Sequence, residues 1–175
     1  HTRKVAEFIA ERLRIRGHRV DLVDVASATA LDVTAAYQAA FVGGSVHQHR
    51  HQSALLHFAK SNRDWLAAMP LALFSVSLAA ATDDMDGRLE ARRMADEFVD
   101  ESGLKPLVTS CIAGALKYTQ YDYFKRLLMR MISKQQGRST DTSKDTEYTN
   151  WDDAEAFVDE FLAAARIPGS KARAA

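Results

Sequence analysis

Cysteine and proline are scarce in this sequence, which has a single cysteine, Cys111, and only 3 prolines in 175 residues. One cysteine excludes an internal disulfide and fits a protein of a reducing compartment. The chain also lacks an excess of charge of either sign, because 23 basic residues balance 23 acidic ones. General nucleic-acid-binding proteins are strongly basic, so we expect no nucleic acid among the partners.

Long hydrophobic runs and several well-known catalytic motifs are lacking as well. The most apolar stretch, Met69 to Ala81, is interrupted by Pro70, Ser75 and Ser77 and is shorter than the roughly 20 residues that a membrane-spanning helix needs. The sequence has no Gly-x-Ser-x-Gly elbow, Walker loop or Cys-x-x-Cys pair. Hydrolase, nucleoside-triphosphatase and dithiol chemistry therefore have no support.

Helical and strand patterns alternate along most of the chain. A first helix is predicted to end at Gly17, a β-rich run follows at His18–Val25, and a buried strand ends at Gly43. Further helices and strands are predicted at 53–65, 71–76, 86–101 and 107–113, and from Asn150 onward. The apolar residues that define the helix at 86–101 are Leu89, Met94, Ala95, Phe98 and Val99. This alternation indicates an α/β domain with a doubly wound parallel sheet.

Three predicted strands end in small and polar residues, at Gly43-Gly44-Ser45, Ser75-Val76-Ser77 and Ala113-Gly114-Ala115. Ligands of open α/β sheets bind outside the carboxyl ends of the strands, and glycines let backbone amides approach a ligand closely. Glycine and serine also serve ordinary turns. Three such ends in one sheet nevertheless favour a binding site for a flat ligand.

Histidines alternate after the first of these strand ends, at His47, His49 and His51, with His57 nearby. A metal site needs ligands that converge from fixed elements, and no Asp, Glu or Cys stands close in the sequence to complete one. We therefore expect no metal here. A solvated loop, or His47 next to an organic ligand, is the favoured interpretation.

One segment, 117–149, is too long for a simple connection. Apolar residues recur in it at helical spacing, at Tyr121, Phe124, Leu127, Leu128, Met131 and Ile132, and Lys125, Arg126, Arg130 and Lys134 lie opposite them. Two interpretations remain open. The segment forms a surface helix packed on the domain, or a helix that lies on an anionic membrane or covers a hydrophobic substrate.

Taken together, these features resemble the short, flavodoxin-like bacterial protoporphyrinogen oxidases, the quinone-dependent dehydrogenases of haem biosynthesis. The matching stretches are His1-Thr2-Arg3, Gly43-Gly44-Ser45-Val46-His47 with His51-Gln52, Met69-Pro70, Phe74-Ser75-Val76-Ser77-Leu78, Ala113-Gly114-Ala115-Leu116-Lys117-Tyr118, Thr140-Asp141-Thr142 and Tyr148-Thr149-Asn150-Trp151. The similarity includes the long insertion. It implies one flavodoxin-like domain over residues 1–167, followed by a disordered tail at 168–175.

The resemblance implies helices on both faces of the sheet and FMN at the carboxyl ends of the strands. It further implies oxidation of protoporphyrinogen IX to protoporphyrin IX, with menaquinone or ubiquinone as the electron acceptor. The expected location is the cytoplasm, at the inner face of the cell membrane as a peripheral protein, and a homo-oligomer is left open.

Site residues follow from the same resemblance. Thr2 corresponds to the end of the phosphate-binding loop. The sequence shows no obligatory acid–base side chain, so the catalytic residue is left open, with His47 as a candidate. The expected FMN-binding residues are Thr2, Ser45, Val46, His47, Ser75, Val76, Ser77, Leu78, Ala79 and Thr142. The expected substrate and membrane contacts are Tyr118, Tyr121, Phe124, Lys125, Arg126 and Arg130. The family's first strand and most of its phosphate loop would precede His1, and a glycine would be expected where His49 stands.

Other functions on the same fold remain open. A flavodoxin-type electron carrier would be expected to show an acidic docking face, and an NAD(P)H:quinone reductase would have its flavin reduced by NADPH alone. A flavodoxin-like domain that no longer holds flavin is the third alternative.

Overall fold

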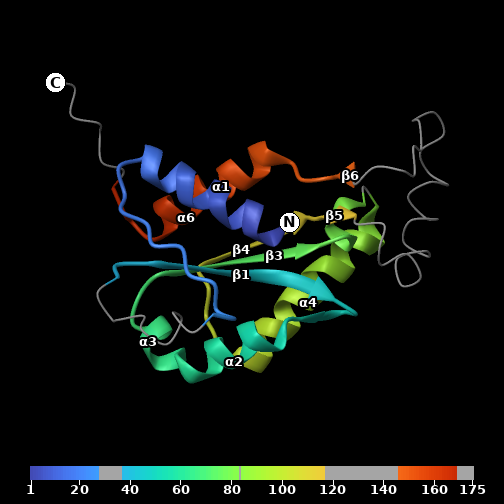
Figure 1. The fold of residues 1–175 in the computed structure, drawn as a ribbon, viewed down its shortest axis with the longest axis horizontal. Coiled ribbons are helices and arrows are strands. Elements are labelled where there is room, and N and C mark those ends of the chain that lie inside the picture. Colours follow the sequence, from blue (N-terminus) through green and yellow to red (C-terminus); the bar gives the residue numbers. More distant parts are fainter. Residues whose placement is uncertain (28–36, 83, 117–145, 169–175) are drawn as a thin grey trace.

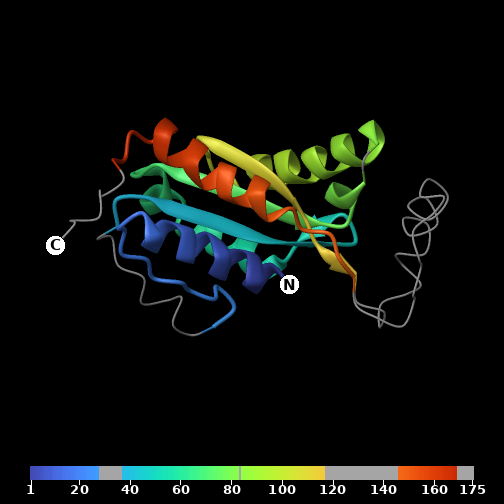
Figure 2. The same ribbon diagram turned by 90° about the horizontal axis from the view of Figure 1, so that it is seen from above.

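The computed structural model describes residues 1–27, 37–82, 84–116 and 146–168 (Figure 1, Figure 2). Within them, the main sheet has the strand order β2-β1-β3-β4. Its strands are β1 (Ala40–His47), β2 (Arg50–His51), β3 (Leu71–Ser77) and β4 (Val108–Ala113). β1, β3 and β4 run parallel, and β2 turns back antiparallel from the end of β1.

Helices cover both faces of this sheet (Figure 1). On one face lie α1 (Thr2–Ile15) and α6 (Trp151–Ala164). On the other face lie α2 (Ser53–Ser61), α3 (Arg63–Ala67) and α4 (Met85–Ser102). The remaining elements are the 3₁₀ helix η2 (Ala79–Ala81) and the antiparallel pair β5 (Ala115–Leu116) and β6 (Thr146–Glu147). The predicted α/β fold with a doubly wound parallel sheet is confirmed.

The central strand β3 is buried along its whole length. Its side chains alternate between two hydrophobic cores: Phe74 packs in the core under α1 and α6, and Leu73 packs in the core above α2 and α4. A parallel strand that is covered on both faces needs apolar residues at nearly every position. This explains the long apolar run that begins near Leu71.

Helices α1 and α6 lie side by side and are joined along their length (Figure 2). Near one end, the Arg16 guanidinium donates to Asp159 at 2.7 Å and to Glu155 at 3.1 Å. The ring of Phe8, in the middle of α1, stands 4.7 Å between centroids from the ring of Trp151, the first residue of α6. The middle of α1 therefore lies beside the start of α6, and the end of α1 lies beside the middle of α6.

Three local expectations differ from the structure. His18–Val25 forms no strand, because β-rich residues need a neighbouring strand to hydrogen-bond. The helix expected at 53–65 is divided at Asn62, whose side chain donates to the Phe58 carbonyl at 2.9 Å. Leu89 is exposed, because the buried side of α4 is formed by Gly87, Ala91, Met94, Ala95 and Phe98.

The edge of β1 away from β3 is paired only at its end, where Val46 and His47 face β2. Along Ala40–Ser45, no strand of the described part of the chain pairs with this edge. The expected helix of the insertion falls within 117–145, and the tail at 169–175 also lies outside the described residues.

Candidate functional site

The carboxyl ends of β1, β3 and β4 lie at one edge of the sheet, together with the β5–β6 pair and the start of α1 (Figure 1). Main-chain hydrogen bonds join these parts: the Gly114 amide donates to the Ser77 carbonyl at 3.0 Å. The Tyr148 amide donates to the Gly114 carbonyl at 3.2 Å. The edge is thus a continuous surface built from segments far apart in the sequence.

The first turn of α1 is tied to this edge through a hydroxyl. Thr149 Oγ1 donates to the Ala113 carbonyl at 2.7 Å, and it lies 2.6 Å from His1 Nε2. A hydroxyl has one hydrogen to donate, so Thr149 accepts from His1, which assigns the proton of the His1 ring to Nε2. Lys4 Nζ lies 2.7 Å from Glu147 and adds an ion pair at the same place.

The start of α1 differs from the starts of α4 and α6. The Asp84 side chain caps α4 at 2.8 Å, and the Asn150 side chain caps α6 at 3.1 Å. Within the described residues, α1 has no side-chain cap and no acidic residue in its first turn, and the same holds for α2. The first amides of a helix have no partner inside it, and the helix dipole favours an anion there. Thr2, the first residue of α1, stands at this anion-compatible position.

The β1–β2 hairpin carries the residues expected to flank the flavin on one side. Ser45 Oγ and His47 Nε2 are 3.0 Å apart, and His47 is exposed. Two residues with positive φ, Gln48 at 50° and His49 at 64°, form the turn. The His49 ring reaches across to α4, where its Nδ1 lies 3.1 Å from Glu90 Oε1.

His51 anchors the base of this hairpin in the protein interior. Its Nε2 lies 3.0 Å from Ser75 Oγ, and its ring centroid is 4.7 Å from that of Phe98. Burial lowers the pKa of His51 from 6.5 to about 4. The imidazole is therefore neutral at neutral pH, and it joins the hairpin to β3 and α4 as a hydrogen-bonded core residue.

The residues expected to flank the flavin on the other side follow β3. Ser75, Val76, Ser77 and Ala79 are buried, and Leu78 is half-buried. The Ser77 hydroxyl accepts from the Ala80 amide at 3.2 Å. Ser75 Oγ is engaged by the buried His51 ring, whereas Ser77 accepts one hydrogen bond and keeps its own hydrogen to donate.

The glycines of β1 have a role in core packing that the sequence did not indicate. A Cβ on Gly43 would overlap the buried ring of Phe74, and a Cβ on Gly44 would lie 2.6 Å from Leu55 Cδ2. The space above each glycine is filled by a neighbouring side chain. The constraint is strongest at Gly43, because the neighbour of Gly44 is the end of a flexible leucine side chain.

The other expected site residues cannot be placed. Tyr118, Tyr121, Phe124, Lys125, Arg126, Arg130 and Thr142 lie outside the described residues. Among the residues that the structure does describe, no group of three or more His, Cys, Asp or Glu side chains could hold a metal ion. No helix in that part of the chain is long and apolar enough to cross a membrane.

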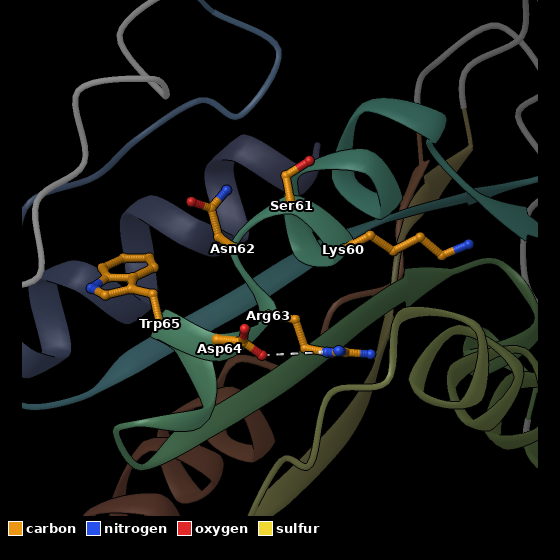
Figure 3. A pocket seen from close by; sticks show the side chains of 6 residues that line it. All are labelled: Lys60, Ser61, Asn62, Arg63, Asp64 and Trp65. Carbon is orange, nitrogen blue, oxygen red and sulfur yellow. Dashed lines mark ion pairs between the residues drawn. The ribbon is translucent and has the colours of Figure 1, made fainter.

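A shallow pocket of about 300 Å³ lies elsewhere, at the junction of α2 and α3 (Figure 3). It is lined by the continuous segment Lys60–Trp65, in which Arg63 and Asp64 form an ion pair at 3.7 Å. α3 leads back to the beginning of β3, so this pocket is at the opposite end of the sheet from the strand carboxyl ends. We do not assign it to the site.

Sequence reasoning missed three contacts at the site: His1 with Thr149, His49 with Glu90, and His51 with Ser75. Each joins residues that are distant in the chain, so no local spacing signals it. The repeated histidines did draw attention to the loop. The partners of His49 and His51 lie on α4 and β3, which contact the loop only in the folded chain.

Comparison with known proteins agrees with this arrangement. A family model described as a flavodoxin domain matches residues 1–143. A relative from Leishmania major, named protoporphyrinogen IX dehydrogenase (quinone), is 31% identical over 93% of this chain and 70% of its own length. A relative of the same name from Escherichia coli strain K12 is 30% identical over 91% of this chain and 87% of its own length. The chain therefore belongs to the flavodoxin-like protoporphyrinogen IX dehydrogenase (quinone) family of oxidoreductases.

Proposed function

We propose that this protein uses FMN to oxidise protoporphyrinogen IX to protoporphyrin IX, with a membrane quinone as electron acceptor, in haem biosynthesis. Every two hydrogens lost by the porphyrinogen would reduce one quinone to its quinol. The main support is the convergence of three strand ends and the start of α1 at one edge of the sheet. This convergence occurs in a chain that is 30–31% identical to the two enzymes of that name.

The chemistry of the edge suits FMN. The uncapped start of α1 and the Thr2 hydroxyl suit a phosphate. The β1–β2 hairpin and the Leu78–Ala79 segment would hold the isoalloxazine ring from its two sides. When bound, FMN would supply the reversible hydride chemistry that no amino acid side chain provides.

The residues of the chain would orient the reactants and manage protons. His47 is the candidate catalytic residue, because its ring is exposed at the edge and Ser45 engages Nε2 at 3.0 Å. This contact leaves Nδ1 to exchange a proton with the substrate. The hydrogen bond of His51 would hold the β1–β2 hairpin to β3, and those of Thr149 would hold the start of α1 to the end of β4.

Anaerobic flavin reduction tests this proposal against the alternatives on the same fold. The protein is titrated with FMN and then mixed with either protoporphyrinogen or NADPH, while flavin absorbance is followed. We expect bleaching by protoporphyrinogen and none by NADPH. Bleaching by NADPH alone would contradict the proposal in favour of an NAD(P)H:quinone reductase, and a flavin that neither donor reduces would favour an electron carrier.

We further propose that the start of α4 contacts an anionic membrane surface. Met85 and Leu89 are 69% and 60% exposed and stand one helical turn apart. Arg92 and Arg93 follow on the same outer side, where they pair with Asp96 and Glu97, and the acidic residues of the first half are Asp86 and Glu90. Two neighbouring exposed apolar side chains are therefore what the contact would rest on. This surface adjoins the edge where a quinone would enter.

Replacing Met85 and Leu89 with serine should weaken binding to anionic vesicles about tenfold, because two apolar side chains would no longer enter the interface. Co-sedimentation with vesicles measures the effect. Leu107→Ser is the matched control, since Leu107 is 54% exposed but precedes β4, at the opposite end of the sheet. Equal binding by the double variant and the control would contradict a membrane contact at α4. The same assay tests whether the insertion binds the membrane, with a variant in which Lys125, Arg126 and Arg130 are replaced by Glu.

A further inference from the structure

The tip of the β1–β2 hairpin is held in an unfavourable backbone conformation. Gln48 and His49 have φ values of 50° and 64°, in the left-handed region that residues other than glycine rarely adopt. Two-residue hairpin turns of this kind are dominated by Asn-Gly and similar pairs. Residues in such a conformation persist only where surrounding contacts hold them there. The structure must therefore supply a contact that compensates this turn.

Glu90 supplies that contact. Its Oε1 lies 3.1 Å from Nδ1 of His49, and its side chain is 30% exposed, whereas the His49 side chain is 57% exposed. Glu90 belongs to α4, which is fixed by its Asp84 cap and by the burial of Phe98. The helix is therefore a rigid support for the tip. His51 fixes only the base of the hairpin, through Ser75 and Phe98.

We propose that the His49–Glu90 pair is a positioning contact that holds the hairpin tip against α4 and thereby sets the place of Ser45, Val46 and His47. These three residues lie on the strand that leads into the tip, so displacement of the tip moves them. The consequence for FMN rests on the proposed function. The effect on the hairpin itself does not, because the contact exists within the chain alone.

Amide hydrogen exchange of the full chain without FMN tests the contact directly. Glu90→Gln keeps the shape of the side chain but removes its charge, and it should speed exchange of the hairpin amides about two- to fivefold. The amides of β3 should not change, because the core is intact. Glu97→Gln is the control, since it removes a carboxylate of α4 that pairs with Arg93, on the same helix, and not with a residue of the hairpin. Equal hairpin exchange in the wild type and Glu90→Gln would overturn the proposal.

A double-substitution cycle separates the pair from any general effect of either residue. His49→Gly relieves the backbone strain and removes the partner of Glu90 at once. In the His49→Gly background, Glu90→Gln should therefore leave hairpin exchange unchanged. The same two- to fivefold acceleration in both backgrounds would show that Glu90 acts without His49, and would overturn the proposal.

The dissociation rate of FMN tests the link to the site. Glu90→Gln should release FMN about two- to fivefold faster than the wild type, while Glu97→Gln should release it at the wild-type rate. Faster hairpin exchange with unchanged FMN release would overturn the positioning role. A chain that binds no FMN at all would overturn the proposed function, and the exchange experiment would still decide whether the pair holds the hairpin.

Discussion

Gly43→Ala should lower the free energy of unfolding by about 2 kcal/mol, because the core has no room for one more methyl group. A Cβ at this position would overlap the ring of Phe74, which is buried between the sheet and the helices α1 and α6. Relief would require movement of an aromatic side chain in a packed core or displacement of β1 from β3. Urea denaturation at neutral pH measures the change.

Gly114→Ala provides the control for this substitution. Its Cβ would meet Val76 Cγ1 at 3.4 Å, which is close to ordinary contact, so we expect a loss below about 1 kcal/mol. A second test combines Gly43→Ala with Phe74→Leu, because the smaller side chain makes room for the methyl group. The double variant should lose less stability than the sum of the two single losses. Additive losses, or a Gly43→Ala protein as stable as the wild type, would contradict the packing role.

The wild-type protein should lose about 3 kcal/mol of stability through His51 as the pH falls from neutral to below 4. Burial lowers the pKa of this imidazole from 6.5 to about 4 in the folded protein. Between these two values the unfolded chain binds a proton that the folded protein does not bind. Acid therefore favours unfolding, and the contribution of His51 is fully present only above about pH 6.5.

His51→Gln isolates this effect, because glutamine can hydrogen-bond to Ser75 but does not titrate. Between neutral pH and pH below 4, this variant should lose about 3 kcal/mol less free energy of unfolding than the wild type loses. Other groups titrate in both proteins and cancel in the difference. Stability-versus-pH curves that run parallel for the two proteins would contradict a buried neutral His51. His57→Gln, which replaces an exposed histidine of α2, should show the wild-type pH dependence.

The layers of the fold could be predicted from the sequence because periodicity is a local signal. The apolar run at β3 predicted a buried strand, and the helical pattern from Asn150 onward predicted α6. His18–Val25 shows the limit of such signals. Its residues favour a strand, but a strand also needs a hydrogen-bonding neighbour, and the sequence of the segment does not contain that information.

The sequence could predict that the three strand ends meet at one edge of the sheet, but it could not predict the side-chain contacts there. Small residues at three strand ends indicated one edge of the sheet, and the structure brings these three ends together there. The packing role of Gly43 could not be predicted, since only the packed structure shows that Phe74 fills the space above it. The histidine-rich loop likewise gave no sign that His49 pairs with Glu90 or that His51 is a core residue. Those roles depend on side chains that α4 and β3 bring from elsewhere in the chain.

Quinone-dependent turnover under anaerobic conditions tests the central claim most directly. Protoporphyrinogen serves as donor, menaquinone as acceptor, and protoporphyrin fluorescence reports the product. The proposed function predicts fluorescence that grows with the FMN-loaded protein and quinone and that stops when either FMN or quinone is left out. A protein that holds FMN yet forms no protoporphyrin in the presence of quinone would contradict it.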